Sequence, residues 1–282
     1  MSVRKLFMIA YRCCIVAFIA LVVVAVLTDL PLAWVWVPAA LAIAIALGMS
    51  RKARAEQAGR PPAVEVDAPV TGRWSALNSP ADKVPSHGTH GYGQTYAIDI
   101  VAEPEGPPEA KDDSRPTSRP AFRWLWPVVR RSRDFPAFGA PLLAVADATV
   151  VRATDGQRDH LSRNSLPALV YLMLIEAAVR EMSGATRVTG NHIVLDLGDG
   201  TYAMYAHLQR GSLAVREGDR VRAGQQLARC GNSGNSTEPH VHFQLMDGLD
   251  LDTARGIPFR WRGIGVPRNG EPFTAGEPVL PA

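Results

Sequence analysis

Cys230-Gly-Asn-Ser-Gly-Asn-Ser-Thr-Glu-Pro-His-Val-His-Phe-Gln-Leu245 is a polar loop that runs directly into a segment of alternating residue type. On an extended strand, successive side chains point to opposite faces of the sheet. His240 and His242 therefore share one face, and Val241 and Phe243 share the other. Side chains two residues apart lie roughly 7 Å apart at the backbone, so both imidazoles could serve one metal centre. A surface strand that happens to carry two histidines is the competing interpretation.

A β-rich domain is predicted around this strand. Ile193–Leu197 and Thr201–Tyr205 are separated by Gly198-Asp199-Gly200, and such a turn is typical of a β-hairpin. Further short strands are expected at 73–77, from residue 95 to 101, within 140–153 and within 215–228. The sequence therefore predicts a mainly β fold, built as an antiparallel sheet or sandwich.

Two insertions interrupt the β pattern. The first, at about 103–135, starts with Pro, Glu, Asp and Ser residues and is expected to be an exposed loop. It continues into Trp124-Leu-Trp-Pro, whose aromatic rings are expected to pack the loop on the domain rather than line a cleft. The second, at about 155–188, contains helical spacing over Leu166–Met182 after a Ser165 cap. We expect this helix to pack on the sheet rather than on a membrane, because its charged residues are of both signs.

The first 50 residues predict two transmembrane helices. Leu6–Leu27 is apolar except for Tyr11 and Arg12, and Pro31–Met49 contains no charge. Each run is near the roughly 20 residues that a spanning helix needs. A signal peptide followed by a buried helix fits less well, because no small-residue cleavage site is evident. Residues 51–69 then read as a linker, and residues 70–282 as the folded domain.

Charge is unevenly distributed along the chain. Residues 1–60 hold seven basic and two acidic side chains, whereas the remaining residues hold 23 basic and 25 acidic ones. The residues after residue 60 are slightly acidic overall, so they lack the basic surface that binds nucleic acid. Basic residues at both ends of the predicted hairpin would place both ends in the cytoplasm by the positive-inside rule.

Metal-ligating residues recur along the β domain. The three cysteines form no CxxC pair, so any metal must be held by histidine and carboxylate. Asp99 lies between Ile98 and Ile100, where a charge is costly unless it is paired or bound to a metal. A solvent-facing edge strand is the alternative reading of Asp99. The histidines available to join it are His87, His90, His207, His240 and His242.

Several motifs in order carry a family resemblance. They are Tyr-Ala-Ile-Asp at 96–99, Phe-Gly-Ala-Pro-Leu-Leu-Ala-Val-Ala-Asp-Ala-Thr-Val-Val-Arg-Ala at 138–153, Asn-His-Ile-Val-Leu-Asp-Leu at 191–197, Tyr-Ala-His-Leu at 205–208 and the His-Val-His strand. Together they resemble the lysostaphin-type, or LytM-like, zinc endopeptidases of bacterial cell walls. The resemblance covers residues 84–247, apart from the two insertions. It implies a zinc cofactor and, as substrate, a peptide stem or cross-bridge of peptidoglycan.

The resemblance also implies residue roles. Asp99 and His242 match zinc ligands of the family. His207 and His240 match the histidines that flank the metal and act in proton transfer or in stabilising the tetrahedral intermediate. Zinc lowers the pKa of a bound water and polarises a carbonyl, and histidine moves protons near neutral pH.

One family position is not matched. The usual first ligand lies four residues before the aspartate, where this chain has Thr95. We favour His87 as the replacement, with His90 as the alternative, because glycines around both could fold the loop back to the metal. If neither histidine serves, the domain would be an inactive wall-binding or amidase-activating module. The charge-derived topology leaves a third reading, a cytoplasmic peptidase with another substrate; a peptidoglycan hydrolase would instead lie outside the cytoplasm.

Overall fold

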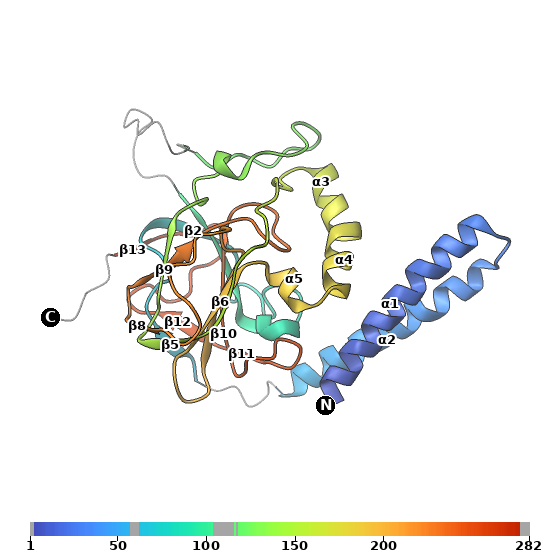
Figure 1. The fold of residues 1–282 in the computed structure, drawn as a ribbon, viewed down its shortest axis with the longest axis horizontal. Coiled ribbons are helices and arrows are strands. Elements are labelled where there is room, and N and C mark those ends of the chain that lie inside the picture. Colours follow the sequence, from blue (N-terminus) through green and yellow to red (C-terminus); the bar gives the residue numbers. More distant parts are fainter. Residues whose placement is uncertain (1–2, 57–61, 104–115, 117, 277–282) are drawn as a thin grey trace.

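A computed structural model describes residues 3–56, 62–103, 116 and 118–276 of the chain. A β domain follows two N-terminal helices that project from it (Figure 1). The main sheet has nine strands, in the order β13-β2-β3-β10-β7-β6-β5-β8, with β11 also paired to β10. The strands of this sheet span Gly72–Asn78 (β2), Ile98–Ala102 (β3), Ala148–Thr154 (β5), His192–Asp196 (β6), Tyr202–Ala206 (β7), Arg220–Val221 (β8), Val241–Met246 (β10), Gly256–Ile257 (β11) and Pro272–Ala275 (β13).

Two smaller pairings complete the β structure. β4 (Pro141–Leu143) pairs with β9 (Gln226–Arg229) in antiparallel fashion. β1 (Val64–Val66) pairs in parallel with β12 (Phe259–Trp261). The mainly antiparallel β fold predicted from the sequence is confirmed, and two apolar helices precede it. β1 lies inside residues 51–69, the stretch predicted as a linker, because its partner strand comes almost 200 residues later and leaves no local signal.

The β6–β7 hairpin shows why local sequence predicts this part of the sheet. Gly198, Asp199 and Gly200 have φ values of 89°, 51° and 74°. Glycine adopts this left-handed region without a steric cost, and aspartate tolerates it better than most residues. The turn therefore closes where the sequence places it, and β7 returns beside β10 with His242 opposite Ala206.

The hydrophobic core lies on one face of β10. Val241, Phe243 and Leu245 all belong to it and are fully buried. The Phe243 ring meets Tyr205 edge-on at 5.4 Å and Phe259 at 5.1 Å. Burying such an aromatic side chain contributes about 1.5–3 kcal/mol. The strand alternation predicted for this segment is confirmed, so His242 and Gln244 face the opposite side.

Short helices fill the second insertion. The segments are α3 (Leu166–Tyr171), a π-helical turn η4 (Leu172–Glu176), α4 (Ala177–Met182) and α5 (Ala185–Thr189). Ser165 caps α3 by accepting a hydrogen bond from the Ala168 amide. Of residues 166–182, only Ala168 and Leu172 are buried. The expectation that this helix packs on the sheet is therefore wrong for most of its apolar side chains.

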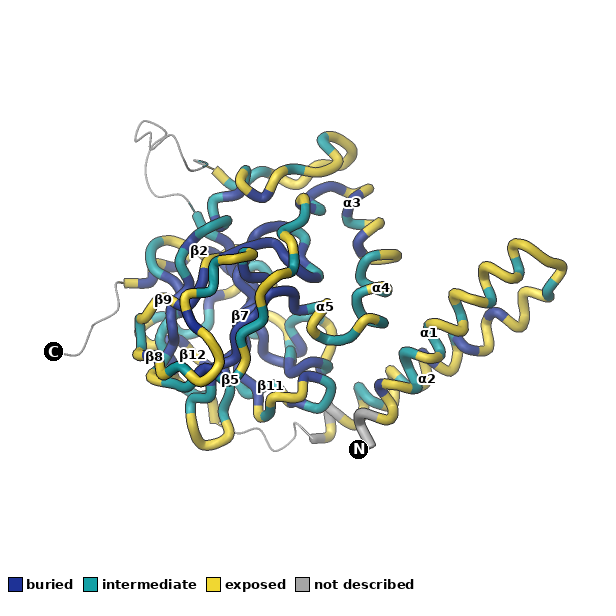
Figure 2. Tube along the Cα trace, viewed as in Figure 1, coloured by how far each residue is buried: buried dark blue, intermediate teal, exposed yellow. Residues whose placement is uncertain are grey.

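The aromatic residues of the first insertion are also exposed. Trp124 and Trp126 have 74% and 80% of their surface accessible, so they do not pack the loop on the domain as expected. Phe135, just after the 3-10 turn η3 (Ser132–Asp134), is buried instead. Figure 2 shows that the exposed parts of both insertions contrast with the buried strands of the sheet.

The N-terminal helices α1 (Val3–Leu27) and α2 (Leu32–Glu56) form an antiparallel hairpin. Segments Leu6–Leu27 and Leu32–Lys52 are long and apolar enough to cross a membrane, and they are largely uncovered by protein. Arg12 Nη2 donates to Asp252 Oδ1 at 2.8 Å, which ties α1 to the loop before β11. The hairpin base therefore contacts the β domain while its turn points away (Figure 1).

We expect Gly231→Ala to destabilise the domain by about 1–3 kcal/mol, because inserted atoms force strain in a packed interior. A Cβ at Gly231 would overlap the backbone of Leu208 and Gln209, just after His207. Gly248→Ala is the matched control, since nothing lies within 4 Å of its Cβ position. Thermal unfolding of the full chain in detergent measures both. Equal melting temperatures for the two variants would contradict the close approach.

Candidate metal centre and catalytic site

Adjacent strands bring two ligand-type residues together. β3 and β10 are antiparallel neighbours, and Asp99 lies directly opposite His242 in their register. His242 Nδ1 is 2.9 Å from Asp99 Oδ1. Both residues are buried, with 6% of Asp99 and 3% of His242 accessible. Strand pairing alone therefore unites positions that are 143 residues apart in the chain.

The loop before β3 supplies a third ligand-type residue. His87 Nε2 lies 2.9 Å from Asp99 Oδ2. The loop is held against the start of β3 by the Ser86 amide, which donates to Thr95 O at 3.2 Å, and by the Ser86 hydroxyl, which donates to Ala97 O at 2.6 Å. One ligand atom from each of His87, Asp99 and His242 lies within 4.8 Å of the others.

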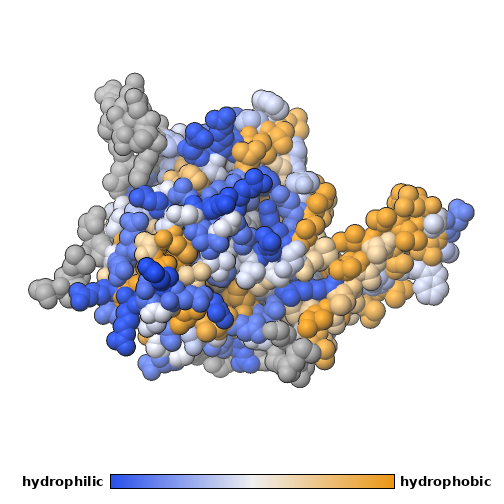
Figure 3. Space-filling view, in the orientation of Figure 1, coloured by the Kyte–Doolittle hydropathy of each residue, from blue (hydrophilic) through white to orange (hydrophobic). Residues whose placement is uncertain are grey.

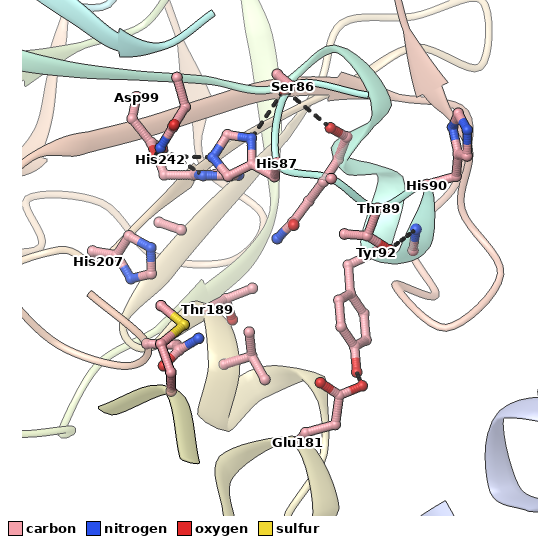
Figure 4. A pocket seen from close by; sticks show the side chains of 18 of the residues that line it. Ser86, His87, Thr89, His90, Tyr92, Asp99, Glu181, Thr189, His207 and His242 are labelled. Carbon is pink, nitrogen blue, oxygen red and sulfur yellow. Dashed lines mark hydrogen bonds and ion pairs between the residues drawn. The ribbon is translucent and has the colours of Figure 1, made fainter. Parts of the chain in front are cut away.

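His90 lies elsewhere in the same loop. Its Nδ1 is 3.1 Å from Thr95 Oγ1, and both side chains are buried. Figure 4 shows His90 on the far side of the loop from the cluster of His87, Asp99 and His242. The structure thus groups His87, the favoured candidate, with the other two ligand-type residues, and it does not group His90 with them.

The two ligand-type histidines are each oriented by a second hydrogen bond. His87 Nδ1 is 2.9 Å from Ser86 Oγ, whose proton is given to Ala97 O, so the ring nitrogen donates. His242 Nε2 is 3.0 Å from Gln244 Oε1, and Gln244 Nε2 donates to Tyr92 O at 2.8 Å. His87 Nε2 and His242 Nδ1 are therefore the ring nitrogens that face Asp99, and each can ligate a metal when it carries no proton. Outer hydrogen bonds of this kind set the tautomer and orientation of metal-binding imidazoles.

Two more histidines face the same centre. The Nδ1 atoms of His207 and His240 lie 2.8 Å from Ser233 O and 2.7 Å from Glu238 O, so each Nδ1 carries a proton and donates. The two rings are 4.8 Å apart, and His240 Nε2 is 3.4 Å from Asp99 Oδ1. Each residue therefore directs its Nε2 into the site, where it can exchange a proton or a hydrogen bond with a substrate.

Burial and charge set the protonation of these groups. Burial alone would raise the pKa of Asp99, but His87 and His240 outweigh it and hold that pKa well below its usual range. Burial, reinforced by His240 and His242, lowers the pKa of His207 well below its usual value. Burial would also lower the pKa of His240, yet the Asp99 charge raises it overall. Asp99 is thus ionised and His207 neutral near pH 7.

The donor set fits a metal such as zinc. Two neutral imidazole nitrogens and one carboxylate converge, and three protein ligands with an open position are typical of catalytic zinc sites. Asn78 Nδ2 donates to Asp99 Oδ2 at 2.8 Å, which restrains the carboxylate on its other side. A divalent cation would also balance the buried charge of Asp99.

Comparison with known proteins identifies the domain. Residues 174–253, which include His207, His240 and His242, match the model of peptidase family M23. The glycyl-glycine endopeptidase ALE-1 of Staphylococcus capitis is 47% identical over 58 residues, which cover 20% of this chain and 16% of that protein. Residues 174–253 thus match part of an M23 peptidase domain. The resemblance to lysostaphin-type enzymes is thereby confirmed.

Two further similarities extend over more of the chain. The murein hydrolase activator NlpD of Salmonella dublin is 24% identical over 169 residues, which cover 60% of this chain and 40% of that protein. The catalytic domain of lysostaphin from Staphylococcus simulans aligns in structure over 66% of this chain and 88% of that one, with 18% identity and a TM-score of 0.32. The chain thus spans less than half the length of either curated relative.

Residues that the sequence did not reveal complete the M23 site. Ser86, Asn78 and Gln244 orient His87, Asp99 and His242 through side-chain hydrogen bonds. Gln244 had a detectable signal, because it lies two positions after His242 on the same face of an alternating strand. Asn78 and Ser86 had none, since their places depend on the pairing of β2 with β3 and on the return of the loop.

The other candidate groups lie outside the M23 site. His192 Nδ1 contacts Gly190 O at 2.8 Å, and His160 Nε2 contacts Gly234 O at 2.9 Å. Both therefore contact main-chain carbonyls of the surrounding loops. Burial raises the pKa of the Cys230 thiol, which keeps it protonated and makes it a poor nucleophile.

A cavity of about 700 Å³ opens in front of the M23 site. Its inner wall contains the five residues of the candidate centre, several of which appear in Figure 4. Its outer wall comes from other segments: Met8, Tyr11, Ala46 and Met49 of the helical hairpin, and Leu172 and Met173 of the second insertion. Residues of the hairpin and of this insertion therefore share the cavity with the site.

We expect Gln244→Leu to weaken metal binding by about 10–100-fold, the usual effect of losing an outer-shell partner. The side chain would keep its volume but could not accept the proton of His242 Nε2 or donate to Tyr92 O. Gln226→Leu, on the exposed edge of β9, is the matched control. Competition titration with a zinc-sensitive dye measures the affinity. Unchanged affinity in Gln244→Leu would show that the His242 tautomer is set by something else.

Proposed function

We propose that this chain is a membrane-anchored zinc metalloendopeptidase that hydrolyses peptide bonds of peptidoglycan. The observation that carries the proposal is the convergence of His87, Asp99 and His242 beside the Nε2 atoms of His207 and His240. A wall-binding module needs no such set of buried ionisable groups, whereas metal-assisted hydrolysis uses each of them. The M23 match and the name of ALE-1, an endopeptidase, support the same reaction class.

The roles follow from the geometry. His87 Nε2, an oxygen of Asp99 and His242 Nδ1 would hold the zinc ion. A bound zinc would supply Lewis-acid activation of a water molecule and of the scissile carbonyl. His207, which is neutral, presents the Nε2 lone pair as a proton acceptor. A cation in the site would lower the pKa of His207 further, so this assignment survives metal loading.

His240 takes the complementary part. Its Nδ1–H is held by Glu238 O, and its Nε2 lies next to Asp99. From there it can donate a hydrogen bond to the oxygen that gains charge as the peptide carbon becomes tetrahedral, or pass a proton to the leaving amine. The cavity of about 700 Å³ in front of these groups would hold part of a peptide chain.

We expect His242→Ala to abolish both zinc retention and hydrolysis. His240→Ala should retain zinc but release muropeptides far more slowly, by about 10²–10⁴-fold, the typical contribution of a general acid–base group. Elemental analysis of the purified full chain in detergent, together with digestion of isolated sacculi, measures both properties. A chelator should stop the wild-type reaction, and zinc should restore it.

Muropeptide release by the chain alone separates the proposal from its rival. NlpD, a murein hydrolase activator, matches a longer part of this chain than ALE-1 does, which favours an activating role as the second candidate. An activator would release no muropeptide alone, with or without zinc, but would stimulate an added amidase. Equal zinc loss in His242→Ala and His240→Ala would contradict the division of roles between them.

The hairpin is proposed as a membrane anchor that leaves the domain outside the cytoplasm. Both hairpin ends lie at the domain, so domain and ends share one side of the membrane (Figure 1). The basic residues Arg51 and Lys52 argue for the cytoplasmic side by the positive-inside rule. Peptidoglycan as substrate requires the opposite side. The resemblance to cell-wall enzymes decides our choice.

We expect a C-terminal alkaline phosphatase fusion to be active and a C-terminal green fluorescent protein fusion to be dark after export through the general secretory route. Both results follow from an extracytoplasmic domain, because the phosphatase needs an oxidising compartment to form its disulfides. A fusion after Thr28, in the hairpin turn, should give the reverse pattern and serves as the control. A fluorescent C-terminal fusion would exclude peptidoglycan as the direct substrate.

A further inference from the structure

The two insertions form one exposed apolar surface. We define the insert face as the large apolar side chains of the aromatic loop and of the helix α3–η4–α4: Phe122, Trp124, Leu125, Trp126, Val170, Tyr171, Met173, Leu174, Ile175 and Val179. Of these residues, Trp126 is the most exposed in the aromatic loop and Leu174 the most exposed on the helix, with 80% and 72% of their surface accessible. A soluble surface rarely collects so many large apolar residues unless something covers them.

We propose that the insert face rests on the same lipid bilayer that holds the helical hairpin, and so keeps the catalytic cavity at the membrane surface. The proposal rests on the proposed membrane anchor. It adds a second contact with lipid, made by the catalytic domain itself, and it defines where a substrate must be to reach the site.

The position of the insert face identifies the bilayer as its occupant. In Figure 1, the helix α3–α4 lies on the side of the β domain from which the hairpin projects. Figure 3 shows hydrophobic surface over the aromatic loop, over α3–α4 and along the hairpin, all toward that side. Met173 joins the hairpin residues Met8 and Met49 in lining one cavity, so the apolar surfaces meet there. Lipid that surrounds the hairpin is thus already beside the insert face.

The chemistry of the aromatic loop suits a lipid interface. Trp124 and Trp126 expose rings that carry an N–H group, and tryptophan is enriched at the boundary between headgroups and hydrocarbon. Arg123 and Arg131, at either end of the loop, are exposed as well. Such basic side chains are attracted to anionic headgroups, while the apolar ones enter the layer beneath.

Charged residues of the helix do not oppose lipid contact. Glu176 receives two hydrogen bonds of 2.8 Å from Arg163 and lies 3.5 Å from Arg180. Glu181 accepts a hydrogen bond from the Tyr92 hydroxyl at 2.8 Å. The charges that argued against membrane contact in the sequence are therefore paired within the protein. On this helix most of the large apolar side chains are exposed and the charged ones are half-buried, which is the reverse of the usual order in water.

Tyr92 joins this surface to the hairpin and the site. Its hydroxyl lies 2.8 Å from Glu181 of α4 and 3.4 Å from Arg12 of α1, and its carbonyl accepts from Gln244, the partner of His242. A bilayer that holds both the hairpin and the insert face would therefore hold the cavity wall in one orientation. Peptides within reach would be those next to the membrane, not those in the outer layers of the wall.

Depth measurements on the full chain test the proposal. Three variants, each with one added cysteine that carries a fluorescent label, are placed in vesicles of phosphatidylcholine and phosphatidylglycerol, with Cys13 and Cys14 replaced by serine and the buried Cys230 kept. Leu174→Cys reports on the insert face, Leu41→Cys on the hairpin, and Arg220→Cys on β8, across the domain from the hairpin (Figure 1). Quenching by lipid-borne nitroxide is compared with quenching by aqueous iodide.

We expect the Leu174 label to be quenched by the lipid nitroxide severalfold more than the Arg220 label, and severalfold less by iodide. If Leu174 behaves like Arg220 while Leu41 is quenched by lipid, the insert face does not touch the bilayer and the proposal fails with the anchor intact. If iodide quenches the label at Leu41 as strongly as the label at Arg220, the hairpin does not lie in the bilayer and the anchor itself fails. Shielding of Leu174 from both quenchers would mean that protein covers the insert face, and this too would overturn the proposal.

Discussion

The pairing of β3 with β10 is the constraint on which the site depends. It sets Asp99 opposite His242 and leaves both on the face of the sheet away from the core. A shift of one residue in this register would turn either side chain to the other face. The core side of the same strand prevents such a slip, because Phe243 is held by Tyr205 and Phe259. Aromatic packing on one face of β10 thus fixes the metal-binding geometry on the other.

The cost of burying these groups explains the hydrogen bonds around them. A carboxylate in a sheet interior is destabilising by several kcal/mol unless opposite charge and donors surround it. Asp99 receives a hydrogen bond from Asn78 and lies beside three imidazoles. On their far sides these three imidazoles contact Ser86, Gln244 and the Glu238 carbonyl, and His207 contacts the Ser233 carbonyl. Each ring is therefore held in one tautomer before any metal or substrate arrives.

The sequence predicts the parts of this arrangement that local patterns control. The β6–β7 hairpin follows from its Gly-Asp-Gly turn, and the shared face of His240 and His242 follows from alternation. The sequence favours His87 over His90 but does not predict the path of their loop, because that path depends on the hydrogen bonds from Ser86 to residues 95 and 97. The β1–β12 pairing was missed for a similar reason: a parallel contact between the two ends of the domain leaves no local trace. Both failures have one cause: contacts between residues far apart in the sequence set the loop of His87 and His90 and the β1–β12 pair.

The insertion α3–η4–α4 shows a different limit of sequence patterns. Helical spacing of apolar residues predicts an amphipathic helix correctly, but it does not say what the apolar face meets. Here only Ala168 and Leu172 turn toward the protein, and the paired acids Glu176 and Glu181 are the less exposed side chains. A helix that turns its charges inward and its apolar residues outward is stable beside a solvent that is itself apolar. This helix also lines the cavity, so whatever surrounds the helix affects how a substrate reaches the site.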